Sequence, residues 1–227
     1  MSQSTTARLP SDYSLLDFVG VVADAQTYRN LLYLLLAFPL GLAYFILLVI
    51  GFSLGLGLAV LGVGLAILFG TILGARLIAS FERWLANTLL GTSLADPDDV
   101  DRSGGAVETV KSYLRASSTW KGAAFVFAKF WLGTASFVLL VSSLGVALEL
   151  LVLPLFPDGL LNVQVIVPVA DQFGTDLQRA LAVPAGAVLA LVALHLLNGF
   201  AGVSRSVATS LLGPETESSG PEASQHA

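Results

Sequence analysis

Cysteine is absent from this 227-residue chain, and charged side chains are scarce. Without cysteine there is no disulfide framework, no thiolate metal site and no cysteine nucleophile. Asp, Glu, Lys and Arg together make up 12% of the residues, about half the share that is typical of soluble domains. This scarcity excludes an ordinary soluble domain and a disordered chain. Acidic residues outnumber basic ones by 16 to 11, so the basic face that nucleic acid requires is also missing.

Long apolar runs dominate the sequence, and hydrophobic residues account for 55% of it. Residues 31–75 contain no Asp, Glu, Lys or Arg, which leaves room for two membrane spans of about 20 residues each. A second run, 123–153, is interrupted only by Lys129 and Glu149, and a third, 180–204, has no formal charge. We therefore expect an all-α integral membrane protein with four transmembrane helices, at about 31–53, 58–79, 123–153 and 180–204. The glycines of residues 51–57 are expected to form the first reversal.

The distribution of basic residues predicts the orientation in the membrane. Of the 11 Lys and Arg, all but Arg179 fall on or near the side that both termini share. Basic residues mark the cytoplasmic side. The sequence thus predicts a multi-pass protein of the cell membrane, with both termini and residues 80–122 in the cytoplasm and residues 154–179 outside.

The two halves of the sequence resemble each other. Residues 38–41, Phe-Pro-Leu-Gly, correspond to residues 130–133, Phe-Trp-Leu-Gly. After the return span, Arg83 and a following Leu-Leu-Gly correspond to Arg205 and a second Leu-Leu-Gly. Both halves are expected to begin and end in the cytoplasm, so we interpret them as two helical hairpins in a parallel repeat. Chance similarity between apolar segments is the alternative.

The remaining segments are polar. Residues 1–24 are expected to be a cytoplasmic segment that contains a short amphipathic helix at the inner leaflet. Residues 107–116 fit a short helix, and residues 214–227 a disordered tail. Residues 92–105, with acidic residues between positions 96 and 101, indicate a solvated turn, and a cation site at these acids is the alternative. An apolar stripe continues the second span as a helix to Gly91, through Leu77, Phe81, Trp84, Leu85 and Thr88.

The outer loop, residues 154–179, contains the candidate sensing residues. Apolar and polar residues alternate at 161–165 and β-branched residues follow to Val167, which predicts a short β-like segment. Glu149, just inside the third span, is interpreted as a proton- or cation-responsive carboxylate that pairs with Arg179. The alternative, which we favour, is an interfacial acid that reaches water. The candidate sensing residues are Glu149, Arg179, Asp171 and Asp176.

Other polar residues have less specific interpretations. His195 and Asn198 lie on one face of the fourth span, where they could bind a ligand or, as is commoner, form hydrogen bonds between helices. Lys129 and Arg76 fit snorkelling anchors at the inner boundary. The expected interface anchors are Trp84, Trp120, Arg29 and Lys121. We find no enzyme motif, and no cofactor is expected.

The aromatic-basic and Leu-Leu-Gly positions carry a family resemblance. Tyr28-Arg29, residues 38–41, Trp120-Lys121 and the two Leu-Leu-Gly segments resemble the sensor domain of prokaryotic membrane proteins that often precedes a histidine kinase and also occurs alone. The resemblance covers about residues 25–214 and implies four spans and a sensing role. It supplies no catalytic residues. A kinase domain would follow the last helix, where this sequence has only a short polar tail.

Two functions are compatible with these features. The first is a membrane sensor or signal-transduction component without a catalytic domain, which passes its signal to a protein partner or acts as a homo-oligomer in the lipid bilayer. The second is an accessory subunit of a transport or efflux complex. The two hypotheses share every hydropathy feature.

Overall fold

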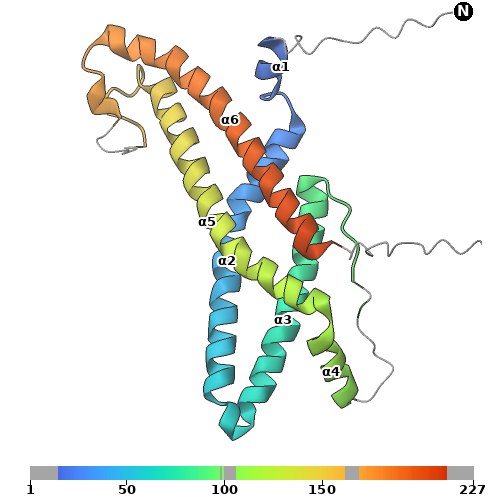
Figure 1. Ribbon diagram of the computed structural model, residues 1–227. Helices are drawn as coiled ribbons and strands as arrows, with labels where there is room; N and C mark the ends of the chain where they lie inside the picture. The colour runs from blue at the N-terminus through green and yellow to red at the C-terminus, as the bar shows by residue number, and fades with distance from the viewer. Residues whose placement is uncertain (1–14, 98, 100–105, 162–168, 214–227) are drawn as a thin grey trace, which may run out of the picture. The chain divides into compact units, whose positions relative to one another are not determined.

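The computed structural model describes residues 15–97, 99, 106–161 and 169–213, which are mainly helical (Figure 1). Four helices are long and apolar enough to cross a membrane, which confirms the expected number: α2 (Ala25–Gly57), α3 (Val63–Leu85), α5 (Ser117–Val152) and α6 (Asp176–Leu212). The shorter elements are α1 (Leu15–Gly20), η1 (Ala59–Leu61), the π-helical turn η2 (Ala86–Leu90), α4 (Ala106–Arg115) and η3 (Ala170–Gln172). The described ranges contain no strand. The predicted β-like segment lies outside them except for Leu161.

Local capping explains why two of the long helices begin before the apolar runs do. The Asp24 carboxylate accepts a hydrogen bond from the Gln26 amide at 2.9 Å, which caps the first turn of α2. At the start of α6, the Gln178 amide donates to the Thr175 hydroxyl and the Thr175 amide donates to the Gln178 side chain. This reciprocal pair is a capping box. The helices therefore begin several residues before the predicted spans.

The first reversal of the chain lies later than the glycines had indicated. Residues 58–62 make the turn between α2 and α3, and Gly62 has a φ of 77°, which a residue without Cβ adopts readily. Gly51 and Gly55 lie inside α2 instead, where they pack against Thr71 and Leu68 of α3. Small residues in membrane helices permit this close approach, so these glycines serve packing rather than the turn.

The chain forms two compact units whose boundaries lie inside α2, α5 and α6. We describe each separately. The first unit comprises the described residues up to Gly41 and Phe130–Val203, and the second comprises Leu42–Lys129 and the described residues from Ser204 onward. The units therefore do not coincide with the two sequence halves. The parallel repeat remains a prediction.

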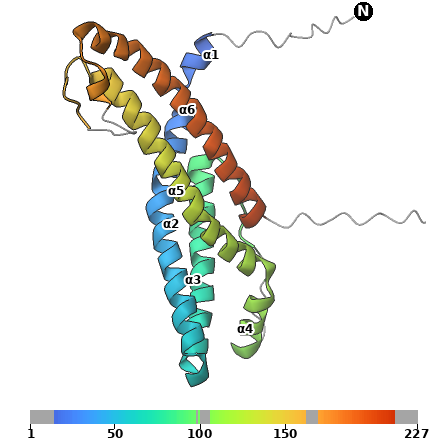
Figure 2. The same ribbon diagram turned by 60° about the vertical axis from the view of Figure 1, so that its left-hand side comes forward.

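In the first unit, α5 and α6 lie side by side and are joined by a long loop (Figures 1 and 2). The apolar core at the loop end consists of Leu150, Leu153, Val169, Ala170 and Ala182. The first part of α2 packs on α5, where the rings of Phe38 and Phe137 stack with centroids 4.6 Å apart. The Ser136 hydroxyl also donates to the Leu34 carbonyl oxygen at 3.2 Å. Both contacts fix α2 against α5 within this unit.

In the second unit, the last part of α2 and α3 form a tight hairpin (Figure 1). Gly122 of α5 lies against Ala79 of α3, and Phe45 of α2 contacts Phe127 of α5 through their rings. The buried side of α3 carries small, charged and two larger apolar residues, namely Gly64, Ala75, Ala79, Glu82, Arg83, Ile72 and Leu85.

The apolar stripe along α3 is mostly on the exposed side of the helix. Leu77, Phe81 and Trp84 are exposed, whereas Leu85 is buried. A membrane-spanning helix has no need to hide apolar side chains, because lipid is as apolar as they are. The exposed large side chains of this stripe are thus available to lipid, whereas Ile72 and Leu85 are buried together with the small residues of α3. The predicted continuation of this helix to Gly91 is confirmed, since α3 and η2 together end there.

Candidate functional site

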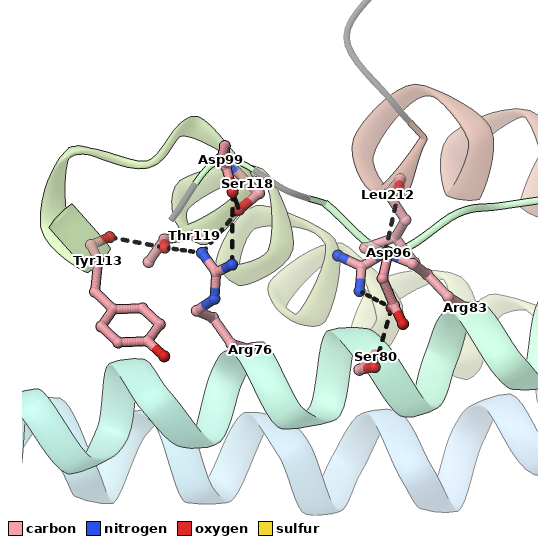
Figure 3. A network of polar contacts seen from close by, with 9 residues as sticks. All are labelled: Arg76, Ser80, Arg83, Asp96, Asp99, Tyr113, Ser118, Thr119 and Leu212. Carbon is pink, nitrogen blue, oxygen red and sulfur yellow. Dashed lines mark hydrogen bonds and ion pairs between the residues drawn. The ribbon is translucent and has the colours of Figure 1, made fainter. Parts of the chain in front are cut away.

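A pocket of about 670 Å³ lies along one face of α3 in the second unit. Arg76, Ser80 and Arg83 line it at intervals of four and three residues, so they share that face. Figure 3 shows both guanidinium groups on the same side of α3, with the Arg83 side chain extended along the helix towards Arg76. The rest of the wall is formed by Leu73, Leu77, Ala79, Asp96, Pro97, Tyr113 and Ser118.

Arg76 is held in place by the corner between α4 and α5. Its Nη1 donates to the hydroxyls of Ser118 and Thr119, at 2.7 and 2.5 Å. Its guanidinium also lies 5.2 Å from the ring centre of Tyr113, within the range of a cation–π contact. The corner itself is fixed, because the Thr119 hydroxyl donates to the Tyr113 carbonyl oxygen. The charge of Arg76 is therefore positioned before any ligand arrives.

Arg83 is buried and only loosely paired with an acid. Its Nε donates to the Leu212 carbonyl oxygen at 3.2 Å, and its Nη1 lies 3.4 Å from the Asp96 carboxylate. The Asp96 side chain is 80% exposed. An ion pair this long with so exposed a partner contributes at most about 1 kcal/mol. In the described part of the chain, Nη2 of Arg83 has no hydrogen-bond partner.

The segment after η2 brings Asp96 to this pocket. Asn87 fixes the turn, since its side chain donates to the Leu94 carbonyl oxygen and accepts from the Leu94 amide, at 2.9 and 2.8 Å. The chain then returns along α3 and places Asp96 within 3.3 Å of the Ser80 hydroxyl. The stretch that the sequence indicated as a solvated turn thus supplies one acid to the pocket wall, and a second, Asp99, to Arg76.

The ion pair between Asp99 and Arg76 depends on pH. Burial raises the pKa of Asp99. The hydrogen bonds from the Ser118 hydroxyl and backbone amide, together with the charge of Arg76, lower it by more than burial raises it, so the pKa lies below its ordinary value of 3.8. A carboxylate whose pKa is lowered by folding stabilises the fold at pH values above its ordinary pKa. This stabilisation is lost as the pH falls through the lowered pKa.

We expect Asp99→Asn to reduce the free energy of unfolding by about 1 kcal/mol at pH 7. The difference from the wild type should shrink as the pH is taken below about 4, because the wild-type carboxylate then also loses its charge. Unfolding in mixed micelles over a pH series measures it. Asp176→Asn, which removes a fully exposed carboxylate, is the control and should change little. An Asp99→Asn difference that is constant down to pH 2 would contradict the assignment.

Glu149 lies in the first unit and is buried, with 1% of its surface exposed. Its carboxylate accepts hydrogen bonds from the amides of Leu160 and Leu161, at 3.1 and 2.9 Å. The interpretation of an acid that reaches water is therefore wrong. The expected pairing with Arg179 is also not made, since the described partners of Arg179 are the Phe173 carbonyl oxygen and Asp176. Glu149 fastens the start of the loop to the end of α5.

Two of the other candidate sensing residues are exposed, and Arg179 is half-buried. Asp171 and Asp176 lie on the surface, and Asp176 is 3.3 Å from Arg179 at the start of α6. The structure thus brings Asp176 and Arg179 together but places Glu149 elsewhere. Among the described residues, no group of three or more His, Cys, Asp or Glu side chains is arranged to hold a metal ion.

His195 and Asn198 have separate surroundings. The Asn198 side chain donates to the Thr27 hydroxyl and accepts from the Asn30 side-chain amide, both at 2.8 Å. These two hydrogen bonds join α6 to α2. His195 is exposed, and its ring stacks on Phe18 of α1 with centroids 4.4 Å apart. The two residues do not form a common site.

The expected anchors are mostly at the surface. Trp84, Trp120 and Arg29 are exposed, and Lys121 is half-buried. The indole of Trp120 donates to the Leu114 carbonyl oxygen at 2.9 Å. These positions suit side chains that meet a membrane interface.

A buried ion pair in the second unit was missed by the sequence interpretation. Lys129 Nζ lies 2.8 Å from the Glu82 carboxylate, and the two side chains are 1% and 0% exposed. Lys129 therefore does not snorkel to the surface. A signal was present, because Glu82 continues the row of small residues at 75 and 79, which in a membrane helix marks the protein-facing side.

Four helices that are long and apolar enough to cross a membrane, with polar groups buried between them, define a multi-pass membrane protein. The chain belongs to the family described as "Putative sensor", whose model matches residues 15–212. No curated protein and no solved structure matches the chain.

Proposed function

We propose that this protein is a non-enzymatic membrane sensor that receives a stimulus at the α5–α6 loop and passes it to a separate protein. The observation that carries the proposal is the family match, which extends from α1 to the end of α6 and so includes every described helix. The extent of the match supports a sensing role for the helical domain itself.

The attachments of the α5–α6 loop support its role as the input. Glu149 binds two consecutive loop amides, and Arg179 binds the Phe173 carbonyl oxygen on the other side of the loop. A stimulus that moves the loop acts directly on the adjoining ends of α5 and α6. Such a shift needs a stimulus with different affinity for two states.

The orientation predicted from the basic residues completes the proposal. It places the loop outside the cell membrane, and both termini and α4 in the cytoplasm. Lys111 and Arg115 of α4 are exposed, which makes this helix the candidate surface for a cytoplasmic partner.

Photo-crosslinking in the native host tests this function. A photoreactive residue at Lys111 or Arg115 should capture a kinase or response regulator, and the same residue at the exposed Asp171 should not. Capture of a permease or a transport ATPase from α4 would instead favour an accessory transport subunit. Capture of the same signalling protein from Asp171 would overturn the proposed orientation, and capture of no signalling protein from α4 would overturn the proposal.

A further inference from the structure

The pocket on α3 is lined by two arginines and one carboxylate, Asp96. A second acid, Asp99, lies 3.6 Å from Arg76 outside the lining, so Arg83 is the arginine whose charge is weakly neutralised. Arg76 is fixed by Ser118 and Thr119 and is thus a preorganised charge. Arg83 is buried, with its pairing to Asp96 stretched to 3.4 Å. Two guanidinium groups on one helix face repel each other, and an anion between them relieves that repulsion.

We propose that this pocket binds a phosphate group, with Arg76 and Arg83 as its ligands and Asp96 as the acid that it displaces. Guanidinium groups suit phosphate because their planar fork can donate two parallel hydrogen bonds. Asp96 is held at 3.3 and 3.4 Å by Ser80 and Arg83 and is otherwise solvated. It can therefore leave at little cost, and the Ser80 hydroxyl and the Arg83 donors are then free for the phosphate oxygens.

The surroundings favour a phospholipid headgroup as the source of the phosphate. Leu73 and Leu77 form the apolar part of the wall, and Leu77 is 73% exposed. Trp84, next to Arg83 in sequence, is 58% exposed, and exposed tryptophans of membrane helices are typical of the headgroup level. An anionic lipid could place its phosphate on the arginines and its acyl chains along these leucines. Basic pockets beside spanning helices bind headgroups in this manner.

Lipid titration of the full-length protein by native mass spectrometry tests the inference. Palmitoyl-oleoyl phosphatidylglycerol should bind more tightly than the corresponding phosphatidylcholine. Arg83→Gln should weaken phosphatidylglycerol binding about tenfold or more, the loss expected for a charge-assisted hydrogen bond. Arg205→Gln removes an equal charge at an exposed position of α6 and should have little effect.

Asp96→Asn is expected to strengthen lipid binding, whereas a misfolded variant would bind lipid more weakly. Removing the competing carboxylate should tighten phosphatidylglycerol binding roughly three- to fivefold, whereas Asp176→Asn should not. If inorganic phosphate competes with the lipid and protects the protein against heat in lipid-free micelles, the natural ligand is a soluble phosphate compound. Equal losses in Arg83→Gln and Arg205→Gln, or no gain in Asp96→Asn, would overturn the site. None of these outcomes depends on which protein crosslinks to α4.

Discussion

Replacing Lys129 by methionine should lower the free energy of unfolding by about 3–5 kcal/mol. The substitution leaves the Glu82 carboxylate buried without its cation, since the Lys129 ammonium group lies 2.8 Å from it and neither side chain has more than 1% exposure. The cost is high because a lone charge is stabilised neither by water nor by an opposite charge. Reversible unfolding in mixed micelles measures the change.

The double variant Glu82→Leu/Lys129→Met separates this cause from lost packing. Replacing both partners by apolar residues removes the buried charges together, so the double variant should recover most of the lost stability. Lys111→Met, at an exposed position of α4, should change stability by less than about 0.5 kcal/mol. A Lys129→Met variant as stable as Lys111→Met would show that the pair contributes little.

Gly133→Ala should destabilise the protein by about 1–3 kcal/mol or more. A Cβ at this position of α5 would collide with the carbonyl oxygen of Ala37 and with the backbone of Phe38 in α2. These are backbone atoms, so relief requires the helices to move apart, which also weakens the stacking of Phe38 on Phe137. The same unfolding assay measures the loss.

Gly199→Ala provides a control with the opposite expected sign. A Cβ at Gly199 of α6 has no atom within 4 Å to meet. In open space, alanine favours a helix over glycine by up to about 1 kcal/mol, so this variant should be as stable as the wild type or more so. If both alanine variants shift stability in the same direction, the close contact of α2 with α5 is not what determines the effect of Gly133→Ala on stability.

The sequence predicted the four long helices because membrane spans need about 20 apolar residues, and such runs are conspicuous. It predicted their ends poorly, because the ends depend on single polar contacts. Asp24 starts α2, and the Thr175–Gln178 pair starts α6, each several residues before the apolar run. Glycine had two meanings as well, since Gly51 serves packing whereas Gly62 makes the turn.

The sites were harder to predict because each charge was interpreted alone. Lys129 and Glu82 are 47 residues apart, and nothing local in the sequence shows that they are partners. Glu149 was correctly singled out as an acid within a span, but its partners are backbone amides, which no side-chain pattern reveals. The arginine pocket could have been noticed from the spacing of Arg76, Ser80 and Arg83, since these positions share one helix face.

The amide chain in the first unit has a mechanical consequence. Gln26 donates to Asn30, Asn30 donates to Asn198, and Asn198 donates to Thr27. Because Asn198 is bonded through both ends of its amide, α6 cannot slide along α2 by part of a turn without breaking two hydrogen bonds at once. The contact therefore resists small displacements of α6 along α2, and a larger displacement breaks both hydrogen bonds in one step.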